Sequence, residues 1–416
     1  MTFSKEYLQH LILKTDSVCR DLRMQALNQF LASGFPTTQH EDWKYTDVSV
    51  IANNNFEMHE KSTVNIHAII EKYFTFAAHR LVFVNGCYFE TSFSDQLEKN
   101  IIISHVAKHQ DKICDLILKS NSTGFAALND ALFQDGAYID IPENINLKIP
   151  IHILYIQTEN KIAQMNHFKN FISIGANGTV TIYEDYVGVE NSTYFNNIAA
   201  HIISKPKSIL NYYRLQRESK QAFHIAKIDI YPLCDSIVNT YHIQVGAKLG
   251  RHDLNYCFNE KSASGNLLGL YYGSQNQHLD FHTCVDHAAE HNTSHQNYRG
   301  IMFEYARGVF NGKIIVRKTA QKTSAHLKNR NLLLSEHAEI DTKPELMIDA
   351  DDVQCSHGAT VGCLDEQALF YLKSRGISEE KARKILIQSF AGEILDQLLH
   401  PEIQSYIRSA VMQYDY

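Results

Sequence analysis

The 416-residue chain lacks several patterns that would define its class at once. None of its cysteines pair as Cys-x-x-Cys, which argues against an autonomous zinc ribbon or a ferredoxin-type cluster loop. No apolar run approaches the roughly 20 residues that span a bilayer. There is no Gly-x-x-x-x-Gly-Lys-Ser/Thr loop, so P-loop ATP hydrolysis by this chain is not expected. These absences predict a chain with no membrane segment and no ATPase activity of its own.

The chain also lacks a basic block and a signal-peptide core. Its formal net charge is −7, whereas nucleic-acid binders normally carry a basic excess on at least one face. The cysteines are scattered, and residues 1–6 begin without the apolar stretch of a secretory leader. We therefore expect a soluble cytoplasmic protein without a nucleic-acid partner, whose thiols are free. These thiols belong to Cys19, Cys87, Cys114, Cys234, Cys257, Cys284, Cys355 and Cys363.

The length of the chain predicts two or three structural units. The first, residues 1–135, has a mainly helical pattern. Apolar side chains at helical spacing, Val18 among them, predict a helix from about Lys5 to Leu31, which ends before Gly34. The rest of this region is predicted to hold a strand, a tight turn and two more helices, at 79–84, Asn85-Gly86, 113–117 and 126–132.

The second unit, residues 136–360, consists of short β-rich runs with almost no helical periodicity. A sandwich of two sheets would also give many short strands. So long a stretch of this texture favours a β-solenoid, in which successive coils stack on one another. We interpret the glycines in its second half as turn residues: Gly246, Gly250, Gly265, Gly269, Gly273, Gly300, Gly308 and Gly312.

The third unit, residues 361–416, returns to a helical pattern. One helix is expected from Asp365 to Arg375, a second after the capping residue Ser378, and a third after Pro401. The second helix has an apolar stripe that suits either a partner or the solenoid itself, and spacing alone does not decide between them. This stripe comprises Ala382, Ile385, Leu386, Phe390, Ile394 and Leu398.

The segment 351–362 carries the strongest chemical signal. Cys355 and His357 are two residues apart beside Gly358, so in a strand both side chains leave the same face. Sulfur and imidazole suit iron, zinc or an iron–sulfur cluster better than magnesium or calcium. Structural zinc and most clusters need about four protein ligands, so two must come from elsewhere. Spacing alone favours the alternative, a buried thiol beside a hydrogen-bonded histidine.

Two other groups of polar residues give weaker signals. Five histidines between 277 and 298 have four-residue gaps that would suit a metal-binding helix face, but the gap has no meaning in strands, and we expect no metal centre there. These are His278, His282, His287, His291 and His295. The acidic residues Asp349, Asp351 and Asp352 could serve a β-helical lyase or hydrolase, but turn chemistry is the preferred interpretation.

Three segments carry a resemblance to a known family. They are CSHGAT at 355–360, LDEQALFYLKSRGI at 364–377, and GFPTTQHEDWKYT at 34–46. The first two resemble the carboxy-terminal signature of the SufB/SufD family, and the third resembles the amino-terminal signature of its SufD branch. The resemblance spans nearly the whole chain. It implies a right-handed parallel β-helix (136–360) between amino-terminal and carboxy-terminal helical domains.

The resemblance also implies a function. Such a protein is a non-catalytic scaffold subunit that assembles iron–sulfur clusters with SufB and with SufC, an ABC-type ATPase. It implies that Cys355 and His357 lie near the SufB contact and bind transient iron or a nascent cluster shared with SufB. SufC is expected on the carboxy-terminal helices, at the stripe from Ala382 to Ile394. Cys363 stands where the family commonly has a glutamine-like residue, so we interpret it as structural.

Alternatives remain open from the sequence. One is a stand-alone β-helical enzyme, either metal-dependent or carbohydrate-active. Another is an adaptor in which Cys355 and His357 are inert. The isolated chain could also form a homodimer.

Overall fold

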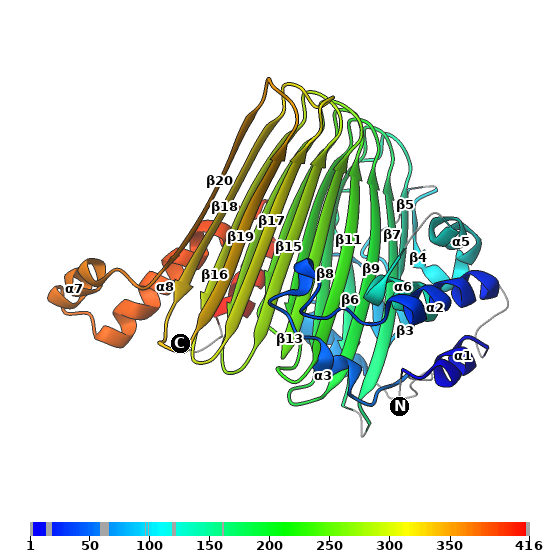
Figure 1. Ribbon diagram of the computed structural model, residues 1–416, viewed down its shortest axis with the longest axis horizontal. Helices are drawn as coiled ribbons and strands as arrows, with labels where there is room; N and C mark the ends of the chain where they lie inside the picture. Colours follow the sequence, from blue (N-terminus) through cyan, green and yellow to red (C-terminus); the bar gives the residue numbers. More distant parts are fainter. Residues whose placement is uncertain are drawn as a thin grey trace.

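The computed structural model describes residues 3–13, 19–58, 66–95, 97–98, 100–118, 122–159 and 162–412. In this part of the chain, parallel strands stack into a long solenoid with helices at both ends (Figure 1). The predicted fold class, a mainly β solenoid flanked by helical segments, is confirmed.

The strands fall into two ten-stranded sheets in the described residues, and from the strand that begins at Ala137 onward successive strands alternate between them. The sheet called A here holds β1 (Glu57–Met58), β4 (Ile102–His105), β5 (Ala137–Ile141), β7 (Gln164–Ile174), β9 (Tyr194–Ser204), β11 (Phe223–Pro232), β13 (Leu249–Phe258), β15 (His278–His287), β17 (Arg307–Val316) and β19 (Glu339–Ile348). Sheet B holds β2 (His79–Val84), β3 (Cys87–Ser92), β6 (Ile151–Gln157), β8 (Thr179–Gly188), β10 (Ile209–Arg217), β12 (Ile237–Gln244), β14 (Ser264–Gly273), β16 (Thr293–Met302), β18 (Ser324–Leu333) and β20 (Gln354–Gly362). Each coil thus adds one strand to each sheet.

Side chains alternate between the bore of the solenoid and its outer faces, as the two-residue period of a strand requires. Inward side chains from Leu81 near one end to Ala350 near the other form one buried cluster. Aromatic rings stack in register along the bore. Tyr155 lies 5.0 Å from Phe83 and 4.5 Å from Tyr186, measured between ring centroids. This continuous core is what holds successive coils together.

The interpretation of the glycines as turn residues is wrong for all but Gly246. The other seven lie inside β13, β14, β16 and β17. The turns from sheet A to sheet B instead repeat a left-handed residue that is not glycine, such as Asp235 (φ 58°) and Lys322 (φ 61°). Backbone N–H groups of these residues bond to the next coil, Asp235 to Lys261 O (3.3 Å) and Lys322 to Asp352 O (2.7 Å). Contacts between coils therefore fix a conformation that the residue type alone does not favour.

The amino-terminal region contains short helices, which pack on sheet A except for the segment 66–74, which packs on sheet B. They are α1 (Lys5–Leu13), α2 (Arg20–Ser33), η1 (Glu41–Trp43), α3 (Ser49–Ala52), α4 (His67–Ile70), η2 (Glu71–Tyr73), η3 (Val106–Lys108), α5 (Gln110–Leu118) and α6 (Gly124–Leu132). The hairpin at Asn85-Gly86 and the two later helices are confirmed. A single helix over 5–31 is wrong, because Cys19 precedes α2 with a left-handed φ of 63°; Val18 lies outside the described residues.

The expectation that all thiols are free is also wrong for two cysteines. Cys19 and Cys114 form a disulfide between the start of α2 and α5, with Cα atoms 5.8 Å apart. These residues are 95 positions apart in the sequence, so only the packing of α2 beside α5 brings them together. The thiols of Cys234, Cys257, Cys284, Cys355 and Cys363 are free.

The carboxy-terminal helices are α7 (Glu366–Ser374), α8 (Glu379–Leu395) and α9 (Pro401–Met412), as predicted. Asp365 caps α7 and Ser378 caps α8 through their side-chain oxygens. Apolar residues of α8 and α9 pack on the outer face of sheet B, whereas α7 projects beyond β20 (Figure 1). Among the described helices, none combines the length and the apolar character that crossing a bilayer requires.

Candidate functional site: the open end of the solenoid

Cys355 and His357 lie on the inward face of β20, at the last coil of the solenoid. Parallel pairing with β18 places Cys355 beside Ala325 and His357 beside Leu327, two residues buried in the main core. Cys355 packs against that core and is partly buried, while His357 is exposed. The thiol and the imidazole therefore stand side by side at the open end of the bore.

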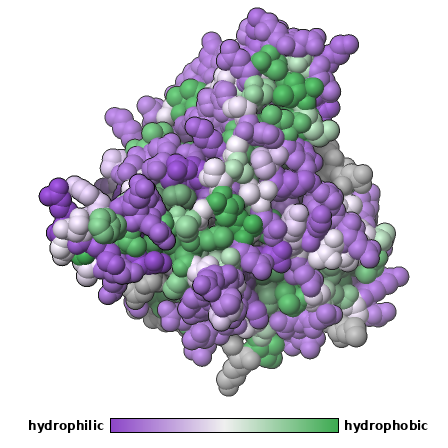
Figure 2. All heavy atoms as spheres, turned by 60° about the vertical axis from the view of Figure 1, so that its left-hand side comes forward, coloured by the Kyte–Doolittle hydropathy of each residue, from purple (hydrophilic) through white to green (hydrophobic). Residues whose placement is uncertain are grey.

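Both sheets end at this coil. The strand order of sheet B ends at β20 and that of sheet A ends at β19, and no described strand pairs with their outer edges. Hydrophobic side chains are exposed here, with Met347 55%, Ile348 41% and Val361 46% exposed. Figure 2 brings this end of the molecule forward and shows hydrophobic patches among hydrophilic residues. Unpaired strand edges of this kind readily accept another chain.

The electrostatics of the site favour a neutral thiol. Burial raises the pKa of Cys355, and a backbone contact with Ala325 opposes this only in part. A thiol must lose its proton to bind a metal, so metal binding here would release a proton. Cys355 and His357 supply two ligands of the kind that iron and zinc accept, and such a pair leaves coordination positions for ligands from another source.

Beneath this pair lies a buried polar group that the sequence analysis missed. Thr342 of β19 donates a hydrogen bond to Asn329 Oδ1 (2.8 Å), and Asn331 Nδ2 donates to the same oxygen (2.5 Å). The hydroxyl of Tyr271 donates to Asn331 Oδ1 (2.8 Å). A layer of polar side chains thus lies within the bore in the coil before β20, next to the last apolar residues of the core. Asparagines at inward positions of β18 are the only sequence signal of this change.

The other singled-out residues do not join this site. The side chains of His278 and His282 lie on the outer face of sheet A. The side chain of His287 is buried, hydrogen-bonded to Ser294 (2.9 Å) and stacked on Phe258. His291 is in a turn, and the side chain of His295 lies on the outer face of sheet B. These five histidines are therefore spread over β15, a turn and β16, and in the described residues they do not form one metal-binding cluster.

The acidic residues and Cys363 are at the surface. Asp349, Asp351 and Asp352 are exposed between β19 and β20, where Asp352 forms an ion pair with Lys322. Cys363 is exposed directly after β20 and is not packed in the core. In the described part of the chain, no three or more His, Cys, Asp or Glu side chains are grouped so that they could hold a metal ion.

The apolar stripe of α8 is largely used within the chain. Ala382 and Ile394 are fully buried, and Ile394 belongs to the cluster between α8 and sheet B. Ile385 and Leu386 are half-buried. The half-buried ring of Phe390 lies under the Arg299 guanidinium, 4.6 Å from its centroid. The structure thus favours packing on the solenoid for the carboxy-terminal part of this stripe.

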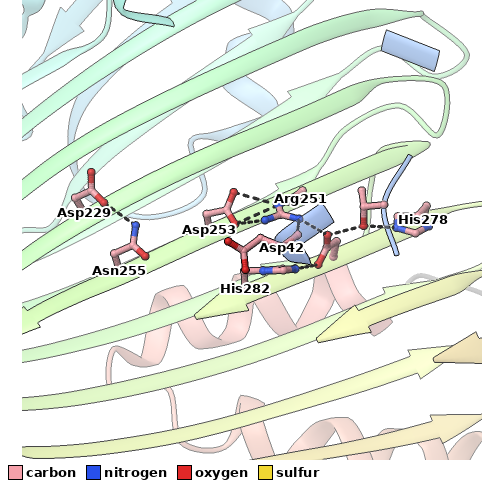
Figure 3. Close-up of polar contacts among 9 residues, drawn as sticks. Asp42, Asp229, Arg251, Asp253, Asn255, His278 and His282 are labelled. Carbon is pink, nitrogen blue, oxygen red and sulfur yellow. Dashed lines mark hydrogen bonds and ion pairs between the residues drawn. The ribbon is translucent and has the colours of Figure 1, made fainter. Parts of the chain in front are cut away.

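The amino-terminal signature packs on the outer face of sheet A, and Figure 3 shows its residue Asp42 beside Arg251. Trp43 stacks under Arg251 of β13, 3.6 Å from ring centroid to guanidinium carbon. Thr46 donates a hydrogen bond to the buried Asp280 (2.6 Å), which also pairs with Arg251 (3.1 Å) and His282 (3.0 Å). Burial alone would raise the pKa of Asp280, but His282 and Arg251 outweigh burial and hold it well below its usual value. This carboxylate is therefore the anchor of the signature segment.

Comparisons with known proteins agree with this arrangement. Residues 155–390 match the family described as "SUF system FeS cluster assembly, SufBD core domain", and residues 3–153 match the SufBD protein N-terminal region. The chain is 34% identical to an iron–sulfur cluster assembly SufBD family protein of Synechocystis over 95% of this chain and 91% of that protein. It is 29% identical to SufD of Escherichia coli (94% and 91% covered) and 26% identical to SufD of Bacillus subtilis (96% and 94%). The chain therefore belongs to the SufB/SufD family of iron–sulfur cluster assembly proteins and is SufD-like within it.

Proposed function

We propose that the chain is a non-catalytic scaffold subunit that pairs with a SufB-like subunit through the open end of its solenoid. In this proposal, Cys355 and His357 contribute an incomplete ligand set to incoming iron or to a nascent cluster. The observation that carries the proposal is their place on the last strand, at an edge where a second chain can add both a strand and the missing ligands.

The iron or cluster is the cargo of this reaction, and the chain's own part is to bind and orient it. Partial burial of Cys355 keeps its thiol protonated until a metal displaces the proton. The exposed imidazole of His357 can reach across the junction. Exposed Met347 and Val361 on the two terminal strands would be buried by the partner, which favours association.

We place the SufC-like ATPase on the carboxy-terminal helices. The docking stripe expected from the sequence includes Ala382 and Ile394, which are inaccessible in this conformation. Accessible apolar side chains lie instead on α7, where Phe370 is 73% and Tyr371 56% exposed, and α8 carries the half-buried Ile385. A partner on α7 and the start of α8 would cover rings that nothing in the described chain covers fully.

The test is cluster assembly in the complex of this chain with SufB-like and SufC-like partners. The His357→Ala and Cys355→Ser variants should still form the complex, because neither side chain holds the core together. Iron and acid-labile sulfide per complex should fall at least severalfold. Cys363→Ser is the matched control, since it removes an exposed thiol beyond the end of β20.

Two outcomes would contradict the proposal. Normal iron and sulfide content in the His357→Ala complex would show that this histidine is not a ligand of the iron or cluster. Turnover of a substrate by the isolated chain would favour the enzyme alternative. The chain alone is expected to form a homodimer through the same edge, which the Val361→Lys variant should weaken in sedimentation experiments.

A further inference from the structure

A row of polar side chains crosses the outer face of sheet B, on the opposite side from Cys355 and His357. The strand register aligns one residue from each of six successive strands, namely Asn211, Asn239, Asn266, His295, His326 and Ser356. The asparagines form an amide ladder, in which Asn239 Nδ2 donates to Asn211 Oδ1 (2.8 Å) and Asn266 Nδ2 donates to Asn239 Oδ1 (2.7 Å). Because the amide nitrogen of Asn266 points back to Asn239, its side-chain oxygen Oδ1 is turned toward the next residue of the row, His295.

His295 and His326 are neighbours in this row. Their rings are nearly parallel, with an interplanar angle of 13° and centroids 5.3 Å apart. Strands are about 4.8 Å apart, so the register fixes this closeness. Two nitrogen ligands of one zinc-like ion are at most about 4.2 Å apart, because each metal–nitrogen bond is about 2.1 Å. Imidazole binds a metal along the lone pair in its ring plane, so the two stacked rings share an ion once they turn about their side-chain torsions until both lone pairs point at it.

His326 is held in a way that suits a ligand. Its Nδ1 lies 2.7 Å from Ser356 Oγ, while Nε2 has only a longer contact to Ser324 Oγ (3.3 Å). A hydrogen bond from Nδ1–H to the serine fixes the ring and leaves the lone pair on Nε2, as the partners of metal-bound histidines usually do. The ring of His295 is exposed to solvent.

The pair opens into a groove of about 800 Å³. Its walls include Asn266, Lys328 and Ser356 of sheet B and, on the other side, Gln397 and Leu399 after α8. This volume is within the range of small-molecule sites and has room for an ion together with water ligands. The side-chain oxygen Oδ1 of Asn266 could also coordinate an ion bound to the two imidazoles.

We propose that His295 and His326 form a surface binding site for a borderline divalent transition-metal ion, with water and Asn266 completing its coordination. Imidazole pairs suit Zn²⁺, Cu²⁺, Ni²⁺ and Fe²⁺, whereas Mg²⁺ and Ca²⁺ prefer oxygen ligands. The site is separate from Cys355 and His357, because the two pairs leave opposite faces of sheet B. It does not depend on the scaffold function proposed above.

Copper provides a direct test. The full chain carrying Cys355→Ser and His357→Ala, freed of metal with a chelator, is titrated with Cu²⁺ and followed by calorimetry and by electron paramagnetic resonance. One ion should bind with hyperfine splitting from two nitrogens. His295→Asn and His326→Asn should each weaken binding at least tenfold and reduce the pattern to one nitrogen. His337→Asn is the control, since His337 is an exposed histidine stacked on Tyr305.

The result that would overturn the proposal is equally specific. Unchanged affinity in both variants, or an equal loss in His337→Asn, would show that copper binds elsewhere. Binding of Mg²⁺ as tight as that of Cu²⁺ would contradict the ligand chemistry. Because both rings are at the surface, the variants should keep the wild-type thermal midpoint; a lower midpoint with unchanged copper affinity would assign the stacked pair a structural role only.

Discussion

At the scale of single residues, glycine makes room for aromatic rings in the bore. A Cβ atom on Gly269 would overlap the ring of Tyr298 on the neighbouring strand, and one on Gly300 would come within 2.6 Å of the Tyr271 ring. Tyr271 and Tyr298 are both fully buried. A large ring on one coil thus needs a missing side chain on the next, which explains why glycine occurs inside these strands.

The Gly269→Ala variant should therefore be destabilised. The added methyl group has no space beside Tyr298, and such overpacking typically costs about 1–3 kcal/mol. Urea unfolding followed by circular dichroism measures the loss. The matched control is Gly362→Ala, because a Cβ there meets nothing within 4 Å and should change stability by less than about 0.5 kcal/mol. Equal stability of both variants would mean that the ring of Tyr298 moves freely.

The sequence predicted the placing of a residue where its neighbours lie on the same strand, and failed where they lie on another coil. Cys355 and His357 could be placed on one face from the sequence, because a two-residue period is enough. The pairing of His295 with His326 could not, since the partner comes from the next coil and the register was unknown. The role of Gly269 was misread for the same reason: the ring that requires it lies on another strand.

At the scale of elements, the signature segment around η1 has no stability of its own. This single short turn is held by Trp43 under Arg251 and by Thr46 on Asp280. Glu41 also forms an ion pair with Lys343 of β19, which ties the segment to the penultimate strand. Contacts with sheet A, not helix propensity, keep the segment in place.

The Asp280→Asn variant should loosen this segment. Asp280 is fully buried and pairs with Arg251, so loss of its charge should cost about 2–4 kcal/mol. Trp43 is the only tryptophan of the chain, so its fluorescence should shift to the red as the ring meets water. Asp341→Asn is the control, because this half-exposed partner of Arg307 should contribute less than about 1 kcal/mol. An unchanged spectrum in Asp280→Asn would show that Trp43 is held without this carboxylate.

The elements differed in how well the sequence predicted them. The carboxy-terminal helices were found because caps such as Asp365 and Ser378 and the apolar period mark them locally. The break at Cys19 was missed, because the apolar pattern continues through it and the disulfide to Cys114 has no local signal. The sequence also could not show that the apolar stripe of α8 packs on sheet B, because such a stripe indicates a buried face but not the surface that covers it.

At the scale of the whole molecule, the bore contains a charged network among its apolar layers. Arg214 and Glu184 are both fully buried, with Nε and Oε2 3.4 Å apart. Arg214 also contacts His224 Nε2 (3.0 Å), whose Nδ1 lies 2.6 Å from Glu218. The solenoid class followed from length and texture, but these charges had no sequence signal, because an inward position is visible only once the register is known. Buried charges of this kind are stable only when paired, so they link neighbouring coils.

Stability of the whole chain should fall as the pH drops below neutrality. Burial lowers the pKa of His152 and His287 to about 4 and of His167 and His242 to about 3, whereas unfolded histidine titrates near 6.5. At a pH between 6.5 and these lower pKa values, the four histidines bind protons in the unfolded chain but not in the folded chain. The contribution of each residue is thus fully present above pH 6.5 and is lost as the pH falls toward 4, by about 1 kcal/mol per pH unit.

Thermal unfolding from pH 7.5 to 4.5 measures this dependence. The midpoint should be nearly constant above pH 7 and should fall steadily below pH 6. His167 illustrates the cause: its ring is fully buried against Phe195, and its Nδ1 accepts a weak hydrogen bond from Asn197 Nδ2 (3.2 Å). No group in the described residues accepts a hydrogen bond from its Nε2, so no partner supports a positive charge. Replacing exposed His337 by Gln should leave the slope unchanged, while His167→Gln should flatten it. A midpoint that stays level down to pH 5 would mean that the interior of the solenoid accepts protons as readily as the unfolded chain does.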